Sequence, residues 1–197
     1  ELPIVLQCGG KGTTLVLSDA ELERSVYEVM VGAFLTAGQR HNSTGRVMVT
    51  DAVYDRFASR LIKQTKNVHV GYGFEPGVFM GPLISENLRT RFRRFSRKLA
   101  GMGHTIVLEP EPPRGTGRGF YVRPSIIAMN WEESNPVLDI EPPGPTLLMY
   151  RVADWQEAVA LHNQLDSRIA TSVFADPNNP VLNEVKQRLR TGALNIN

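Results

Sequence analysis

The side chains best suited to chemistry stand in two short polar stretches. Residues 7–11 read Gln-Cys-Gly-Gly-Lys and hold the only cysteine of the chain, Cys8. Residues 38–44 read Gly-Gln-Arg-His-Asn-Ser-Thr, with His41 at the centre. An imidazole can act as a base or a weak nucleophile, and a thiol can act as a nucleophile. Turns between helices and strands are where α/β folds place such groups, so we expect the chemistry here.

Hydrophobic periodicity predicts the elements that position these stretches. A capping-box spacing at residues 18–21 starts a helix whose apolar face leads directly to His41, and residues 46–50 form the strand that follows it. Alternating helices and strands predict parallel βαβ units in one compact α/β domain over residues 1–197. The other strands are expected at residues 13–17, 104–108, 119–128, 146–152, 168–175 and 192–197, and the other helices at residues 51–67, 85–100, 154–164 and 179–190.

Composition is that of an ordinary globular domain with one well-filled core. The chain has 197 residues, of which 42% are hydrophobic and 21% charged. The net charge of +2 is too small to argue for a nucleic acid or an anionic membrane as partner. A lone cysteine excludes an internal disulfide and favours the reducing cytoplasm. No apolar run approaches the ~20 residues of a membrane span, and the start at Glu1 suggests an excised piece or the removal of a tag.

An arginine-rich helix offers a different interpretation of the charge. Six cations between Arg89 and Lys98 could contact nucleic acid or anionic lipid. We favour a solvated outer face, because opposite charges elsewhere in the chain nearly cancel these cations.

Other short patterns favour no site. The Gly-Gly-Lys of residues 9–11 lacks the spacing of a phosphate-binding Walker loop. Four carboxylates between Glu132 and Glu141 lack the regular ligand spacing of a calcium loop, so a solvated acidic loop is favoured. His69, His104 and His162 show no metal-ligand spacing, and no metal site is predicted.

Six segments, taken in order, resemble the NAD(P)-dependent aldehyde dehydrogenase superfamily. The resemblance covers essentially the whole chain and implies the family's catalytic domain, with a mostly parallel sheet flanked by helices. The separate coenzyme-binding domain is not expected here, because the chain has no Gly-x-Gly-x-x-Gly unit. The similar segments are residues 6–11 (family Glu-Leu-Gly-Gly-Lys), 38–41 (Gly-Gln-Arg-Cys), 80–85, 119–126 (Gly-aromatic-Phe-Val-x-Pro-Thr), 141–145 (Glu-Ile-Phe-Gly-Pro) and 192–197 (Gly-x-Val-x-Val-Asn).

Two departures fall on the catalytic positions that the resemblance implies. His41 stands where the family has its nucleophilic cysteine, and Gln7 stands where it has its general-base glutamate. An imidazole adduct does not readily replace a thiohemiacetal in hydride transfer, and an amide takes up no proton at ordinary pH. We interpret Cys8 as a structural residue. His41 can also be interpreted as a polar loop residue without a catalytic role. We therefore expect a domain that is inactive alone and serves a structural or interaction role.

The alternative is part of an aldehyde or semialdehyde oxidoreductase that another segment or subunit completes. By resemblance, Glu141 corresponds to the glutamate that holds the nicotinamide ribose, although Pro143 replaces the neighbouring aromatic residue. Lys11 and Arg46 also match family positions but are as easily explained by local packing and surface solubility. NAD(P) is expected only by resemblance and not as a cofactor of this chain alone. The expected partners are a coenzyme-binding domain or a family subunit, with a small aldehyde only if the chain is active, and no nucleic acid or membrane.

Overall fold

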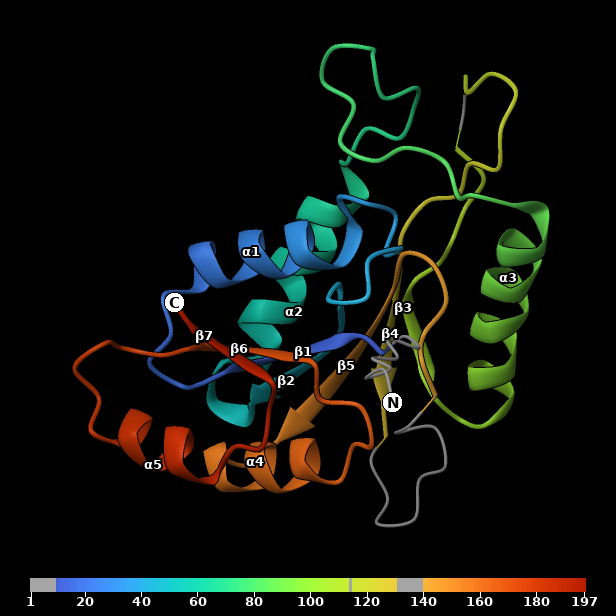
Figure 1. Ribbon diagram of the computed structural model, residues 1–197. Helices are drawn as coiled ribbons and strands as arrows, with labels where there is room; N and C mark the ends of the chain where they lie inside the picture. The colour runs from blue at the N-terminus through green and yellow to red at the C-terminus, as the bar shows by residue number, and fades with distance from the viewer. Residues whose placement is uncertain (1–9, 114, 131–139) are drawn as a thin grey trace, which may run out of the picture.

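A seven-stranded, mostly parallel sheet forms the centre of the computed structural model, which describes residues 10–113, 115–130 and 140–197 (Figure 1). The strand order is β3-β4-β5-β2-β1-β6-β7, and only β3 runs antiparallel to its neighbour. This confirms the predicted α/β class. The strands are β1 (Gly12–Val16), β2 (Thr44–Thr50), β3 (Thr105–Leu108), β4 (Ser125–Met129), β5 (Thr146–Val152), β6 (Ala170–Phe174) and β7 (Ala193–Ile196).

Helices cover both faces of this sheet. In Figure 1, α1 and α2 lie together on one side, α4 and α5 lie on the other, and α3 runs beside β3. The helices are α1 (Leu22–Phe34), α2 (Asp51–Lys66), α3 (Glu86–Gly101), α4 (Trp155–Asn163) and α5 (Val181–Arg188). Within the described residues, helices and strands follow the order that the hydrophobic pattern predicts, with α2 and α3 in succession and β3 to β5 in succession, although several ends differ.

Alternate residues of the central strands supply two separate cores. In β2, Val47 and Val49 pack with α1 and α2, whereas Met48 packs with α4 and α5. Burial on both faces explains why these strands are almost continuously apolar. Polar side chains inside such strands therefore need an explanation, and Thr13 and Thr14 of β1 are both only 2% exposed.

Three predicted boundaries were wrong. The cap of α1 is Glu21, whose carboxylate accepts hydrogen bonds from the Glu23 and Arg24 amides, so the helix begins later than the capping box at residues 18–21 indicates. Strand β4 begins only at Ser125, because residues 119–124 make a single bridge to the segment before α3. Helix α5 ends at Arg188 and not at residue 190, and Gly192 lies beyond it, just before β7. A Cβ there would lie 2.8 Å from the Ile169 carbonyl oxygen, so its role is close backbone packing.

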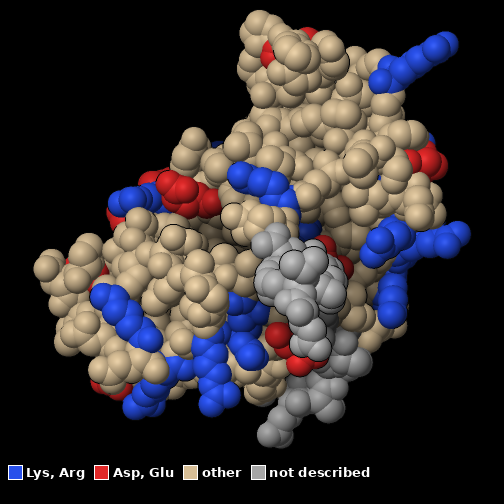
Figure 2. Space-filling view, viewed as in Figure 1, with Lys and Arg blue, Asp and Glu red and all other residues tan. Residues whose placement is uncertain are grey.

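The arginine-rich helix α3 buries its apolar stripe and exposes its cations. Phe92, Phe95 and Leu99 are buried, and Ser85 caps the helix by accepting a 3.2 Å hydrogen bond from the Leu88 amide. Figure 2 shows Lys and Arg side chains projecting from the edge that α3 forms. Among the residues described, no helix is long and apolar enough to cross a membrane.

Candidate functional site

The loops that carry the predicted site residues meet at the amino ends of β1, β2 and β5. Lys11 precedes β1, the turn with His41 precedes β2, and Glu141 lies shortly before β5. These strands are parallel and adjacent, so their amino ends lie at one edge of the sheet. The sequence predicted that the chemistry lies in helix-to-strand turns. It did not show that these turns lie at the amino ends of the strands, whereas α/β folds usually bind ligands at the carboxyl ends.

A buried lysine joins the β1 loop to the β5 loop. Lys11 is only 2% exposed, and its Nζ donates a 2.6 Å hydrogen bond to the Gly144 carbonyl oxygen. Burial lowers the pKa of this ammonium group to about 7. Glu141 opposes the shift and Arg46 adds to it. Of the two local explanations of Lys11, surface solubility was wrong and packing is confirmed, because the side chain is buried in the interior of the site.

Two glycines make room for this lysine. Gly38 has a φ of +63°, and a Cβ there would lie 2.1 Å from the Gly144 carbonyl oxygen and 3.0 Å from Lys11 Nζ. A Cβ at Gly45 would lie 2.6 Å from Lys11 Cβ. Gly38, which begins the polar stretch of residues 38–44, is thus required by packing as well as by its left-handed backbone.

Arg46 strengthens the same connection from β2. It is 3% exposed, and its Nη2 donates a 2.9 Å hydrogen bond to the Ile140 carbonyl oxygen. Its surface interpretation was also wrong. Lys11 and Arg46 together fix the backbone on both sides of Glu141.

Glu141 itself is exposed and lies against the glycine loop. Its Oε2 accepts a 2.9 Å hydrogen bond from the Gly10 amide. Gly10 has a φ of +100°, and a Cβ there would lie 1.9 Å from Ser167 Oγ. The cavity between these residues has a volume of only about 20 Å³, so the described residues leave room there for at most one water molecule.

His41 projects from a tight polar turn. The Ser43 amide donates to the Arg40 carbonyl oxygen at 3.1 Å, and the Arg40 amide donates to Ser43 Oγ at 3.2 Å. His41 and Asn42 are exposed at the tip. Within the described ranges, the His41 imidazole makes no hydrogen bond or ion pair, so no carboxylate orients it as a base.

Gln39 ties this turn to the segment before α3. Its Oε1 accepts a 2.8 Å hydrogen bond from the Ile84 amide, and its Nε2 donates to the Pro82 carbonyl oxygen at 3.3 Å. Two of the family-like segments are therefore in direct contact. Gln7 and Cys8 lie outside the described residues.

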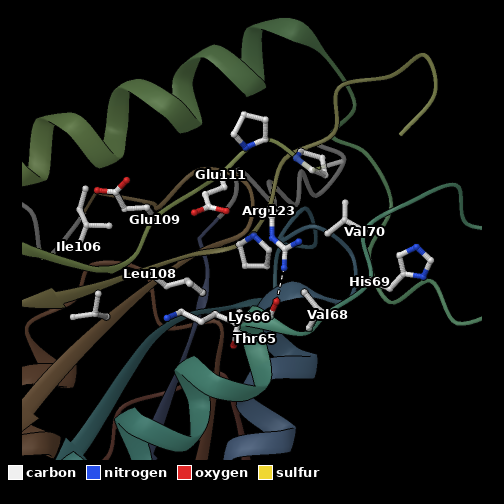
Figure 3. Close-up of a pocket in the computed structure, with 14 residues that line it drawn as sticks. Thr65, Lys66, Val68, His69, Val70, Ile106, Leu108, Glu109, Glu111 and Arg123 are labelled. Atoms are coloured by element: carbon white, nitrogen blue, oxygen red, sulfur yellow. Dashed lines mark hydrogen bonds between the residues drawn. The ribbon is translucent and has the colours of Figure 1, made fainter. Parts of the chain in front are cut away.

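One sizeable cavity is remote from these loops. It has a volume of about 720 Å³ and lies between the end of α2, β3 and the proline-rich loop after β3, where Arg123 donates a hydrogen bond to the Lys66 carbonyl oxygen (Figure 3). It contains none of the predicted site residues. The described residues also hold no group of three His, Cys, Asp or Glu side chains that could bind a metal ion.

A second cavity, of about 320 Å³, adjoins the turn of His41. Arg40 and Asn42 line it, whereas His41 between them does not. Another wall is formed by Thr14 of β1, Ser172 of β6 and Asn195 of β7, on the face of the sheet that α1 covers. These three residues were missed by the sequence reasoning, and their only signal was the polar character of Thr14 and Ser172 within otherwise apolar strands.

The match to known proteins covers the whole fold. The profile of the aldehyde dehydrogenase family matches residues 2–197. The chain belongs to the aldehyde dehydrogenase family. Because the match reaches both polar stretches and all seven described strands, the domain described above fits the family's catalytic domain.

Named relatives are aldehyde dehydrogenases of several kinds. The chain is 30% identical over 173 residues to the chloroplastic betaine aldehyde dehydrogenase of Beta vulgaris, covering 88% of this chain and 34% of the relative. It is 29% identical to the alpha-ketoglutaric semialdehyde dehydrogenase of Bacillus subtilis, covering 87% of this chain and 35% of the relative. The family domain therefore spans about a third of the length of these relatives.

Solved structures show the same fold. A betaine aldehyde dehydrogenase from Staphylococcus aureus in complex with NAD+ superposes with a TM-score of 0.87 at 27% identity, over 95% of this chain and 37% of that chain. Lactaldehyde dehydrogenase from Escherichia coli gives a TM-score of 0.86 at 25% identity, with 95% and 39% coverage. The described part of the chain therefore has the fold of these family members.

Proposed function

We propose that this domain does not oxidise aldehydes by itself and serves as a structural or interaction module within a larger assembly of the family. The observation that carries the proposal is the turn of His41. An imidazole without a carboxylate partner within the described chain replaces the thiol that the family reaction needs, on a scaffold that is otherwise well packed. Loss of such a nucleophile usually costs several kcal/mol of transition-state stabilisation.

A second candidate function is one part of an NAD(P)-dependent aldehyde or semialdehyde oxidoreductase that is completed by another segment or subunit. Glu141 favours it. Its carboxylate is exposed and held in place through one oxygen, so Oε1 can accept a hydrogen bond from a ribose hydroxyl. The 20 Å³ cavity beside it has no room for a nicotinamide ring, so other contacts must come from a coenzyme-binding partner. NAD(P) would supply the hydride acceptor, and Glu141 would orient its ribose.

The first experiment measures nicotinamide reduction at 340 nm by the purified chain with NAD or NADP over a panel of aldehydes. We expect no turnover from the native chain, while cooperative thermal unfolding shows that it is folded. Turnover that His41→Ala or Cys8→Ala abolishes would identify a reacting group and overturn the proposal.

The second experiment adds an isolated coenzyme-binding domain from a family member. Complex formation without turnover supports the interaction module. Turnover on mixing, lost with Glu141→Gln, would establish the second candidate instead. The cytoplasmic location stays a prediction from the single cysteine, Cys8, and it is the same for both candidate functions.

A further inference from the structure

The cavity beside the His41 turn has an unusually polar floor. Thr14 of β1 pairs in register with Ser172 of β6, and Ser172 pairs with Asn195 of β7. All three side chains line the 320 Å³ cavity, so they form one row across three adjacent strands. Neighbouring strands are about 4.8 Å apart, so the row extends for about 10 Å.

Helix α1 closes this cavity on the other side. Val31 and Gly32 of α1 line it, and a Cβ at Gly32 would lie 2.6 Å from the hydroxyl oxygen of Thr44. In Figure 1, α1 crosses above the end of β7 close to the C-terminus. The space therefore lies between the sheet and helix α1, with exposed residues at its rim.

The polar side chains around the cavity have no partner among the described residues that a ligand would have to displace. The side chains of Thr14, Ser172, Asn195 and Thr44 make no hydrogen bond or ion pair with any other described residue. Thr14 is buried, Ser172 and Thr44 are half-buried, and Asn195 is exposed, so the row runs from the interior of the cavity to its rim. A ligand can therefore form hydrogen bonds with these groups without breaking any within the described chain.

Two charged residues stand at the rim. Arg40 and Glu28 both line the cavity, both are exposed, and neither forms an ion pair within the described residues. A guanidinium group binds carboxylates through two parallel hydrogen bonds. Glu28 would accept hydrogen bonds from hydroxyls and would disfavour a second negative charge on a ligand.

We propose that this cavity binds a small polyhydroxylated monocarboxylate, with its carboxylate on Arg40 and its hydroxyls along the row of Thr14, Ser172 and Asn195. Hydroxyl and amide groups both donate and accept, so they match ligand hydroxyls in either direction. The volume lies at the lower end of the range of ligand cavities, ~300–1,000 Å³, and suits a chain of about six carbon atoms. The site goes beyond the proposed function, since it needs neither a nicotinamide nor a catalytic group.

The test is isothermal titration calorimetry of the 197-residue chain with three matched six-carbon probes. Gluconate carries hydroxyls and a carboxylate, sorbitol carries only hydroxyls, and hexanoate carries only a carboxylate. We expect gluconate to bind at least about tenfold more tightly than either of the others. Saturable binding that is equal for gluconate and sorbitol, or no saturable heat with gluconate, would overturn the proposal.

Two variants and two controls locate the binding. Arg40→Gln should weaken gluconate about tenfold, to the level of sorbitol, and Thr14→Val should weaken both about fivefold. Arg56→Gln on exposed α2 and Thr13→Val, the neighbour that lies on the opposite face of β1, should leave the Kd unchanged. Unaltered binding by Thr14→Val, with cooperative unfolding intact, would place the ligand elsewhere.

Because the titration contains no aldehyde, cofactor or partner domain, its failure would leave the proposed function standing.

Discussion

Lys11 Nζ donates its hydrogen bond to the Gly144 carbonyl oxygen at 2.6 Å, across 133 positions of sequence. The bond joins the loop before β1 to the loop before β5, on either side of the turn that precedes β2. A single buried amine thus joins two family-like segments, and Gly38 of a third packs beside it.

Lys11 should make the stability of the domain depend on pH above neutrality. Its pKa is about 7 in the folded chain and 10.5 for an ordinary lysine, so between these values the unfolded state binds more protons. The free energy of unfolding should therefore rise as pH increases from 7 to 10.5, by an amount on the order of a few kcal/mol. Urea unfolding of the native chain and of Lys11→Met at pH 7, 8, 9 and 10 measures it. Parallel curves for the two proteins would contradict the prediction.

His162 should make the domain sensitive to acid. It is fully buried, its Nε2 lies 3.2 Å from the Arg190 carbonyl oxygen, and burial lowers its pKa from 6.5 to about 4. The unfolded chain takes up a proton first, so stability should be lost as pH falls from 6.5 towards 4, by roughly 2–3 kcal/mol.

Urea unfolding at pH 7 and pH 4.5 checks the acid sensitivity. His162→Gln keeps a donor for the Arg190 carbonyl oxygen but does not titrate, so its loss between the two pH values should be smaller. The exposed His69→Gln variant is the control and should behave as the native chain does. An equal loss in all three proteins would assign the acid effect to other groups.

Gly38→Ala should disrupt the connection between the His41 turn and β5. The new methyl group would meet the Gly144 carbonyl oxygen at 2.1 Å, on a residue with a φ of +63°. We expect a loss of about 2–4 kcal/mol in the free energy of unfolding. In the control Gly73→Ala, nothing lies within 4 Å of the added methyl group, and the change should stay within about 1 kcal/mol. Similar losses in both variants would rule out the close contact as the cause.

Gln39→Ala should loosen the segment before α3. The Ile84 amide would lose its 2.8 Å acceptor, Gln39 Oε1, so its hydrogen exchange should accelerate about tenfold while the exchange of β2 amides stays unchanged. Hydrogen exchange followed by NMR reports both. Gln187→Ala, on the exposed side of α5, serves as the control. Unchanged exchange at Ile84 would show that the Gln39 amide does not fix this segment.

Element types could be predicted because local chemistry specifies them. Strand β5 was predicted at Thr146–Val152, with the bounds that the structure has, since an apolar run between turn residues is a strong signal. Ser85 and Asp154 cap α3 and α4 because their short side chains reach the free amides of the first turn. The start of α1 was wrong because two local signals compete there: Glu21, three residues after Ser18, accepts hydrogen bonds from the first-turn amides and is the cap.

The sequence by itself determined the elements, their order and the two polar stretches with His41 and Lys11, because periodicity and turn chemistry act over a few residues. Only the tertiary structure decided that Lys11 and Arg46 are buried and that Glu141 lies against Gly10. It also decided that Thr14, Ser172 and Asn195 form one row beside the His41 turn. Such neighbours come from distant parts of the chain, and strand order and register, which no local pattern encodes, bring them together.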